Sequence, residues 1–206
     1  MSSTEGTVFI VDDDLSMRKA LERLCQSAGL RVKTFASARE FLDRWTPESP
    51  ACIVLDVRMP GLSGLDLQAE IATRNIQAPI VFITGHGDIP MSVKAMKAGA
   101  VDFLTKPFRH KALIAVIPEA ISKDVRLKES QMEQQTNERC LQTLTPRERQ
   151  VFEMVVKGML NKQIAFELGT SEQTIKVHRG RVMEKMQVSS VAELVQAAVK
   201  VGTLKS

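Results

Sequence analysis

Long apolar runs and paired cysteines are both missing from this chain of 206 residues. No apolar stretch approaches the ~20 residues that a membrane-spanning helix requires. The opening segment, MSSTEGTVFIVDDD, has neither the basic residues nor the apolar length of a signal peptide. Cys25, Cys52 and Cys140 show no CxxC spacing, so the sequence predicts neither a disulfide framework nor a zinc site. We therefore expect a cytoplasmic protein without a membrane partner, in which Cys25 and Cys52 are buried as small apolar residues.

The net charge of +4 is unevenly distributed along the chain. Acidic and basic residues balance up to residue 140, whereas residues 141–206 contain ten lysines and arginines against six acids. A basic small unit joined to a neutral larger one is typical of a nucleic-acid-binding tail, although a solvated basic surface explains the same charge. The length and this division favour two domains.

An alternating pattern of strands and helices extends from residue 7 to about residue 120. The predicted strands are 7–11, 31–35, 52–55, 80–83 and 102–105, and the predicted helices lie near 15–28, 37–45, 64–74, 89–98 and 108–121. Such alternation is typical of βαβ units and a parallel sheet. We expect an α/β, flavodoxin-like (βα)5 domain with a parallel five-stranded sheet, ending at residue 121.

The remainder of the sequence predicts a linker and a small helical domain. Residues 122–140 contain no glycine or proline and are almost wholly polar, which favours an interdomain linker with helical propensity. Thr145, Pro146 and Glu148 then form a helix start, with a hydroxyl cap, a proline at the first helical position and an acid that reaches back to the cap. Three further helical segments follow without a strand, so residues 141–206 should form an all-α four-helix domain.

Four of the predicted strands end at a residue with ionic or reactive chemistry. VFIV is followed by Asp12 and Asp13, CIVL by Asp56, IVFI by Thr84, and FLT by Lys106. Since the carboxyl ends of parallel strands share one edge of a sheet, these side chains should converge. Three close carboxylates repel one another unless a cation is bound. Mg²⁺ fits, because it takes few protein oxygens and retains waters, with Asp12 acting through water.

An amine and a hydroxyl beside such a magnesium site would bind a phosphoryl group. A carboxylate can also act as the nucleophile and form an aspartyl phosphate. Asp56 is the candidate nucleophile, because it ends a central strand. Taken singly, Lys106 would be an ordinary surface lysine and Thr84 an ordinary strand residue, so only the combination indicates a site.

Four motifs resemble the receiver domain of two-component response regulators, across roughly residues 5–122. They are VFIVDDD, IVLDVRMPGLSG, IVFITGHGD and AMKAGAVDFLTKPF. The resemblance implies that Asp56 accepts a phosphoryl group from a sensor histidine kinase. It also implies that Asp12 and Asp13 bind Mg²⁺ with Asp56 and the backbone carbonyl of Arg58, and that Lys106 binds the phosphate.

The same resemblance implies a conformational switch. Thr84 and Phe103 would be the switch pair, and the fourth helix, fifth strand and fifth helix would then present an altered face for homodimerisation. Pro118 departs from a regular fifth helix, because proline in a helix interior costs ~3 kcal/mol. We expect the helix either to kink at this residue or to end early.

The basic tail contains two short helical segments separated by a tight turn, NKQIAFELG and SEQTIKVHRGRVMEKM. A basic helix can enter the major groove of DNA, although the same surface can also be merely solvated. LTPRERQVF, NKQIA and TIKVHRGRVMEKM resemble the helix-turn-helix domain of the FixJ/NarL or LuxR-type regulators, which implies binding of double-stranded promoter DNA. RNA polymerase is a further candidate partner. The implied DNA-binding residues are Lys162, Thr174, Lys176, Val177, His178, Arg179, Gly180, Arg181 and Lys185.

The sequence does not decide the roles of two of these residues, His178 and Gly180. His178 either contacts the DNA backbone or packs within the helical domain. Gly180 stands where many relatives have a larger polar residue, and it costs ~1 kcal/mol of helix stability relative to alanine.

Two other functions remain as alternatives to a DNA-binding transcriptional regulator. The first is a magnesium-dependent phosphatase with an aspartyl intermediate. Haloacid-dehalogenase-like enzymes of that kind place a second acid two residues after the nucleophile, where this chain has Arg58. The second is a protein-docking receiver module that does not bind DNA. We therefore predict a regulator that is not an enzyme and whose promoter binding depends on phosphorylation.

Overall fold

The computed structural model describes residues 6–46, 50–85 and 89–203. The chain divides into two compact units between Leu127 and Lys128. No helix within the described ranges is both long and apolar enough to cross a membrane.

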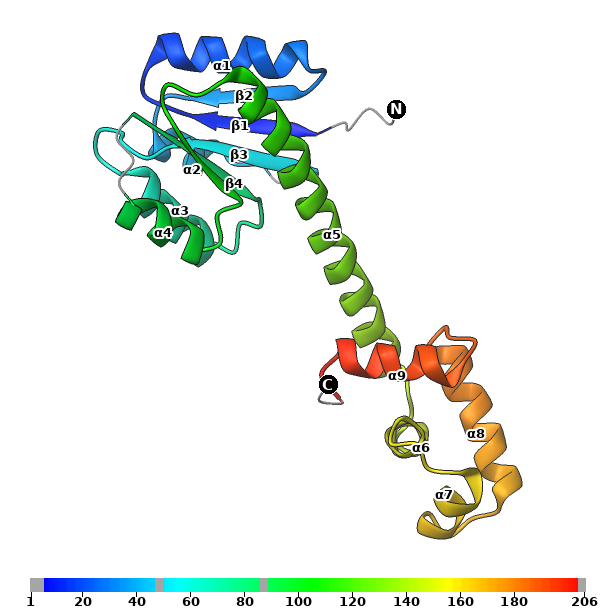
Figure 1. The fold of residues 1–206 in the computed structure, drawn as a ribbon. Coiled ribbons are helices and arrows are strands. Elements are labelled where there is room, and N and C mark those ends of the chain that lie inside the picture. The colour runs from blue at the N-terminus through cyan, green and yellow to red at the C-terminus, as the bar shows by residue number, and fades with distance from the viewer. Residues whose placement is uncertain (1–5, 47–49, 86–88, 204–206) are drawn as a thin grey trace. The chain divides into compact units, whose positions relative to one another are not determined.

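A parallel five-stranded sheet forms the centre of the first unit (Figure 1). Its strands, in the order β2-β1-β3-β4-β5, are β1 (Thr7–Val11), β2 (Arg31–Phe35), β3 (Ala51–Asp56), β4 (Ile80–Thr84) and β5 (Asp102–Thr105). Every residue of β1, β3 and β4 is buried, as expected for parallel strands that are covered on both faces. The predicted flavodoxin-like fold is confirmed.

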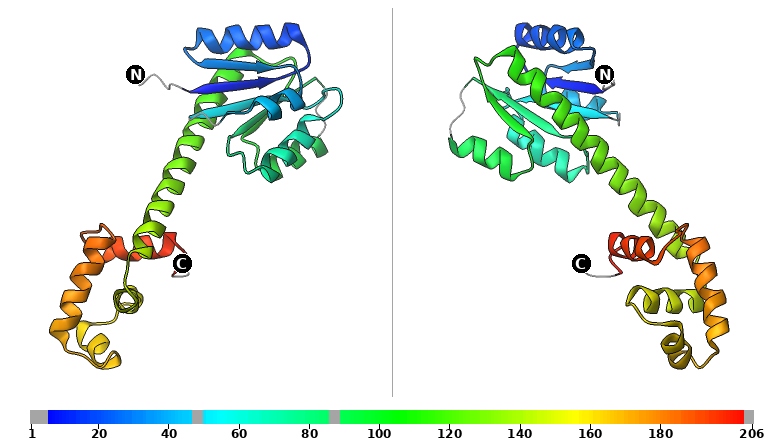
Figure 2. Two further views of the ribbon diagram at one scale, coloured as in Figure 1. Left: turned by 180° about the vertical axis from the view of Figure 1, so that it is seen from behind. Right: turned by 45° about the vertical axis from the view of Figure 1, so that its right-hand side comes forward.

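Helices cover both faces of this sheet (Figures 1 and 2). They are α1 (Leu15–Ser27), α2 (Ala38–Arg44), α3 (Gly64–Thr73), α4 (Ile89–Lys97) and α5 (His110–Gln142). Because consecutive strand residues point to opposite faces, Phe9 packs with residues of α2 and α3, whereas Val8 and Ile10 pack beneath α1 and α5. The result is a three-layer arrangement with two apolar cores.

The cysteines are buried in apolar cores, Cys25 and Cys52 in the first unit and Cys140 in the second. Cys25 and Cys52 are free and buried in the core beneath α1 and α5, as predicted, and Cys140 is also buried. Burial raises the pKa of the Cys25 thiol to about 11, so this thiol stays protonated at neutral pH.

Helix α5 continues well beyond Pro118, so of the two expected alternatives, a kink or an early end, the early end was wrong. The proline is exposed and removes one N–H donor on the solvent side of the helix. Leu113, Ile117 and Ile121 are fully buried against the sheet and hold the helix on both sides of the proline. Beyond it, the buried carboxylate of Asp124 accepts a hydrogen bond of 2.8 Å from the backbone amide of Ala51.

The described residues of the second unit form helices joined by short loops and contain no strand (Figure 2). After the end of α5 it contains α6 (Pro146–Val156), α7 (Asn161–Glu167), α8 (Glu172–Lys185) and α9 (Val191–Lys200). Thr145 and Glu148 form the predicted capping box at the start of α6. Side chains from all four helices share one apolar core, which includes Phe152, Ile164 and Leu194. The predicted four-helix composition is therefore confirmed.

An ion pair joins the start of α6 to the end of α8. The Lys185 ammonium lies 2.6 Å from the buried carboxylate of Glu148 and also donates to the carbonyl oxygen of Thr143. The hydrogen bond from Lys185, together with that from the Thr145 amide, lowers the pKa of Glu148 from 4.5 to about 2. Because the folded value is the lower one, ionised Glu148 stabilises the unit above about pH 4.5. That stabilisation is lost as the pH falls toward 2.

Lys185→Met should destabilise the second unit by roughly 1–3 kcal/mol at pH 7, because it leaves a buried carboxylate without its cationic partner. The loss of stability between pH 4.5 and pH 2 should also become shallower. Urea unfolding of the full chain, monitored by far-ultraviolet circular dichroism, measures both effects.

The sole tryptophan supplies an internal control for this experiment. Trp45 packs against Phe9 and Phe41 in the first unit, so its fluorescence transition should not shift. Lys157→Met, at an exposed position after α6, is the matched variant. Equal destabilisation by both substitutions would contradict a specific role for Lys185.

Candidate functional site

Three carboxylates meet at the carboxyl edge of the sheet. Val11 pairs with Leu55, so Asp12 and Asp56 lie side by side at the ends of neighbouring strands. One oxygen from each of Asp12, Asp13 and Asp56 lies within 4.8 Å of the others. Asp12 and Asp56 are buried and Asp13 is exposed, so the cluster opens to solvent on one side.

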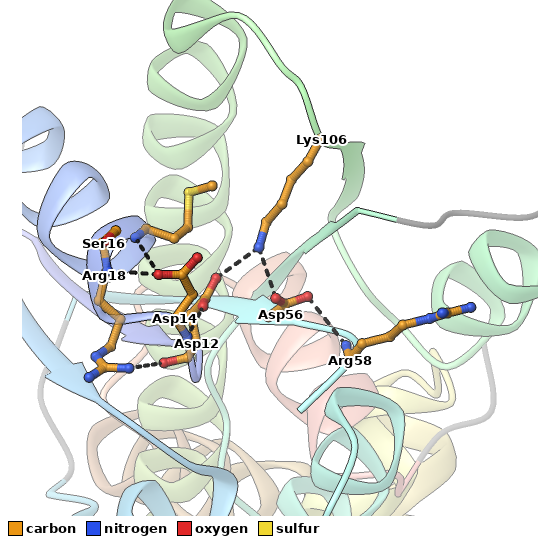
Figure 3. A network of polar contacts seen from close by, with 8 residues as sticks. Asp12, Asp14, Ser16, Arg18, Asp56, Arg58 and Lys106 are labelled. Atoms are coloured by element: carbon orange, nitrogen blue, oxygen red, sulfur yellow. Dashed lines mark hydrogen bonds and ion pairs between the residues drawn. The ribbon is translucent and has the colours of Figure 1, made fainter. Parts of the chain in front are cut away.

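The ammonium of Lys106 bridges two of these acids (Figure 3). Its Nζ atom lies 2.9 Å from an Asp12 oxygen and 2.8 Å from an Asp56 oxygen. Burial by itself lowers the pKa of Lys106, but the hydrogen bonds to Asp56 and Asp12 raise it above the ordinary lysine value. Lys106 is therefore a fixed positive charge between the two carboxylates.

The acids retain an excess of negative charge despite this lysine. Burial raises the pKa of Asp12, which means that its environment disfavours the charged form, while the hydrogen bond from Lys106 opposes the shift. When all three acids are ionised, three carboxylates face one ammonium and two negative charges remain. An acidic pocket of this composition suits a divalent cation with oxygen ligands.

Thr84 lies next to this pocket on β4. Ile83 pairs with Asp56, so Thr84 is one residue further toward the carboxyl edge, and its side chain is fully buried. Its carbonyl oxygen accepts a hydrogen bond of 2.6 Å from the amide of Lys106. Residues 86–88 of the motif that contains Thr84 lie outside the described residues.

Phe103 lies on β5, paired with Phe82 of β4. The two rings are 6.1 Å apart, and Phe103 is half-buried against the core that also contains Ala95 of α4. The aromatic member of the predicted switch pair therefore packs against the same core as Ala95 of α4.

The loop after Asp56 also shapes the pocket. The amide of Arg58 lies 3.3 Å from an Asp56 carboxylate oxygen, and the Arg58 side chain is exposed (Figure 3). A Cβ atom at Gly64 would lie 2.2 Å from the Asp56 carbonyl oxygen, so only glycine permits this close approach of α3. Gly64 was not among the predicted site residues, although its place in the PGLSG segment after Asp56 was the available signal.

The remaining acid of the DDD run has a structural role. Asp14 is the N-cap of α1, and its carboxylate accepts from the amides of Ser16 and Met17. A carboxylate at a helix N-terminus is stabilised by the helix dipole.

In the second unit, α8 presents a continuous exposed face. Ser171 caps the helix by accepting from the Thr174 amide, and Ile175, Val182 and Met186 point into the core. The exposed residues on the remaining surface include Gln173, Thr174, Lys176, Val177, Gly180 and Arg181. Gln173 was not among the predicted contacts, but amide side chains near the start of such a helix can read adenine. Its place in the first turn was the only sequence signal.

The other predicted DNA contacts are placed differently. Lys162 is exposed at the start of α7. Arg179 is half-buried and donates to Asn161 of α7 at 3.0 Å, and Lys185 binds Glu148. His178 is half-buried, and its Nδ1 atom has no hydrogen-bond partner among the described residues. Most of the predicted lysine and arginine contacts are therefore exposed, whereas Arg179 and Lys185 form hydrogen bonds within the domain.

Helix α8 also tolerates a side chain at its glycine. A Cβ atom at Gly180 would have no neighbour within 4 Å, so packing inside the domain does not require glycine there.

Comparison with known proteins gives matches to both units. Residues 8–118 match the response regulator receiver domain, and residues 142–198 match the luxR family of bacterial regulatory proteins. Nodulation protein W of Bradyrhizobium diazoefficiens is 50% identical over 201 residues, which cover 98% of this chain and 88% of that protein.

Two further proteins match nearly the whole chain. The transcriptional regulatory protein FixJ of the same organism is 44% identical over 202 residues, covering 98% of each chain. A solved structure of the response regulator StyR has a TM-score of 0.83 and 47% identity, and it covers 95% of this chain and 99% of its own. The resemblance to FixJ-like regulators is thus confirmed, and the chain belongs to the response regulators that join a receiver domain to a LuxR-type DNA-binding domain.

Proposed function

We propose that Asp56 accepts a phosphoryl group from a sensor histidine kinase. The observation that carries this proposal is the position of Lys106, whose ammonium contacts Asp56 within a cluster of three acids. An Asp56 carboxylate oxygen forms a bond to phosphorus while the P–N bond to the kinase histidine breaks. The electron pair of that bond returns to the imidazole, and Asp56 becomes an acyl phosphate.

The metal ligands in this proposal are Asp13, Asp56 and the backbone carbonyl of Arg58, with Asp12 acting through water. The excess negative charge of the pocket and its all-oxygen donor set support Mg²⁺. When bound, the ion neutralises charge on the transferring phosphoryl group.

The other residues of the pocket orient and report the phosphoryl group. Lys106 moves part of its hydrogen bonding from Asp56 to a phosphoryl oxygen. The Thr84 hydroxyl turns toward the same group, and the Phe103 ring moves into the space that this leaves. A population shift follows because the phosphoryl group interacts more favourably with the second arrangement.

The pocket is better suited to holding a phosphoryl group than to hydrolysing it. The position two residues after Asp56 is occupied by Arg58, which offers no general acid or base for an efficient phosphatase. We therefore propose a cytoplasmic signalling protein rather than an enzyme that turns over phosphate esters.

Asp56→Asn should abolish labelling of the full chain by radioactive acetyl phosphate in the presence of Mg²⁺, since the amide cannot form an acyl phosphate. Label on the parent protein should be released by hydroxylamine. Asp43→Asn, at an exposed position of α2, is the control and should be labelled fully. Undiminished labelling of the Asp56 variant would place the phosphoacceptor elsewhere.

Homodimerisation is proposed through α4 and its neighbours. Ile89, Val93 and Met96 follow one another at spacings of four and three residues, so they form an apolar row on one side of the helix. Their exposed fractions are 80%, 44% and 43%. A row of exposed apolar residues on one helix is suited to burial against a second copy.

Val93→Asp should weaken phosphorylation-dependent dimerisation by more than about tenfold, because it places an unpaired charge in the proposed interface. Analytical ultracentrifugation of phosphorylated protein measures the change. Ala20→Asp, exposed on α1, adds the same charge away from this face and should have little effect. Similar losses in both variants would point to net charge rather than to an α4 interface.

For DNA recognition, we assign residues 1–121 to the receiver, 122–140 to a helical linker and 141–206 to the DNA-binding domain. Helix α8 would enter the major groove with Lys176 and Val177 reaching base edges, while Lys162 meets a phosphate. An apolar side chain such as Val177 suits a thymine methyl group. RNA polymerase at the promoter is a further partner in this proposal.

Lys176→Ala should weaken binding to a specific promoter site by about 1–3 kcal/mol if the lysine reads a base edge. Binding to unrelated DNA should change much less. Mobility-shift titrations on genomic fragments selected by the parent protein test this, with Lys157→Ala as the control for loss of one exposed positive charge. An equal loss on specific and unrelated DNA would assign Lys176 to a phosphate.

A further inference from the structure

Gln68 is a buried polar residue that links two helices of the receiver. Its side-chain amide nitrogen lies 3.2 Å from the carbonyl oxygen of Ala95 and 3.2 Å from that of Ala98. Gln68 belongs to α3, whereas the two carbonyls belong to the last turn of α4 and the residue after it. The last carbonyls of a helix lack intrahelical donors, so Gln68 acts as a C-terminal cap supplied by a neighbouring helix.

The C-terminal end of α4 is fixed by further contacts. Gly99 has a φ of 95°, and its amide donates to the carbonyl oxygen of Met96. The amide of Ala100, which is buried, donates to the carbonyl oxygen of Ala95. Ala95 is also the one residue of α4 that is buried. The buried residue and the carbonyls that accept from Gln68 therefore lie at the C-terminal end of the described part of α4, whereas Met91 in its first turn is half-buried against the same core.

The opposite end of α4 has a different environment. Its first residue, Ile89, is 80% exposed. This end follows β4, which ends at Thr84 beside the acidic pocket. Along the chain, Thr84 therefore precedes the less buried end of α4, while the buried end is held by Gln68.

We propose that Gln68 is a positioning residue that makes the end of α4 a pivot. With residues 95–98 held in place, a displacement that begins at Thr84 swings the exposed apolar row on α4. Without the amide, the whole helix would shift or loosen, and less of the displacement would appear as a defined change of the proposed dimer face. This inference rests on the proposed phosphorylation at Asp56, and it adds the element that converts the local change into a movement of α4.

Hydrogen–deuterium exchange of the unmodified full chain tests the pivot directly. Phosphorylation should speed exchange in the first half of α4 and leave the amides of residues 95–100 equally protected. Loss of protection across the whole helix, including residues 95–100, overturns the proposal. Failure to label Asp56, or labelling without any gain in DNA affinity, would instead refute the proposed function.

The substitution Gln68→Leu removes the amide at nearly constant size. In the full chain, α4 amides should exchange at least about fivefold faster, as expected when the two hydrogen bonds from Gln68 to the Ala95 and Ala98 carbonyls are lost. Labelling of Asp56 should remain within about twofold of the parent, while the phosphorylation-induced gain in DNA affinity should fall several-fold. An unchanged gain overturns the proposal.

A matched control comes from the same helix. The Thr73 hydroxyl donates to the Ala69 carbonyl within α3 and contacts no residue of α4 through a hydrogen bond. Thr73→Val removes this one side-chain hydrogen bond at constant size, and it should leave both α4 exchange and the affinity gain unchanged. If Thr73→Val reduces the gain as much as Gln68→Leu does, the effect belongs to the stability of α3 and the pivot is rejected. Should Gln68→Leu not fold, as judged by Trp45 fluorescence, the exchange pattern of the parent decides alone.

Discussion

The ammonium of Lys106 between Asp12 and Asp56 is the interaction on which the rest of this receiver depends. Lys106 is 94 residues from Asp12 and 50 residues from Asp56 in the sequence, yet it lies within 3 Å of both carboxylates. The contact requires β1, β3 and β5 to end at one edge in a single register. It also requires that a partly buried lysine remain charged, and the two acids ensure this by raising its pKa.

That arrangement balances opposing electrostatic terms. Burial makes ionised Asp12 costly, and one lysine cannot neutralise three carboxylates. A pocket of this kind gains stability from added positive charge and from a redistribution of hydrogen bonds, which are the changes that a divalent cation and a phosphoryl group bring. The surrounding elements differ in how firmly they are held. Strands β1, β3 and β4 are wholly buried, whereas α4 has one buried residue, so the helix is held by fewer buried residues than these strands.

The DNA-binding domain uses its charges in two ways. Lys185 and Arg179 are basic residues of the kind that contact DNA. Their hydrogen bonds to Glu148 and Asn161 instead hold α8 against α6 and α7. The exposed face of α8 consequently carries fewer basic residues than the helix contains, and it includes the uncharged Gln173 and Gly180. Part of the positive charge of α8 therefore serves to hold this helix in the domain.

The sequence by itself determined the strands, most helix positions and the convergence of the strand-end residues. Apolar residues repeat every two positions in a strand and every 3.6 in a helix, which is a local pattern. That the carboxyl ends of parallel strands share one edge of the sheet is a general rule. Only the tertiary structure decided what happens at Pro118, where packing of Leu113, Ile117 and Ile121 on the sheet outweighs the local helix-breaking tendency. The same holds for Gly64, whose neighbour is the carbonyl of Asp56, and for the inward use of Lys185. Each of these features depends on contact with a residue distant in the sequence or on the close approach of two backbone segments. The local pattern of apolar and polar residues encodes neither kind of contact.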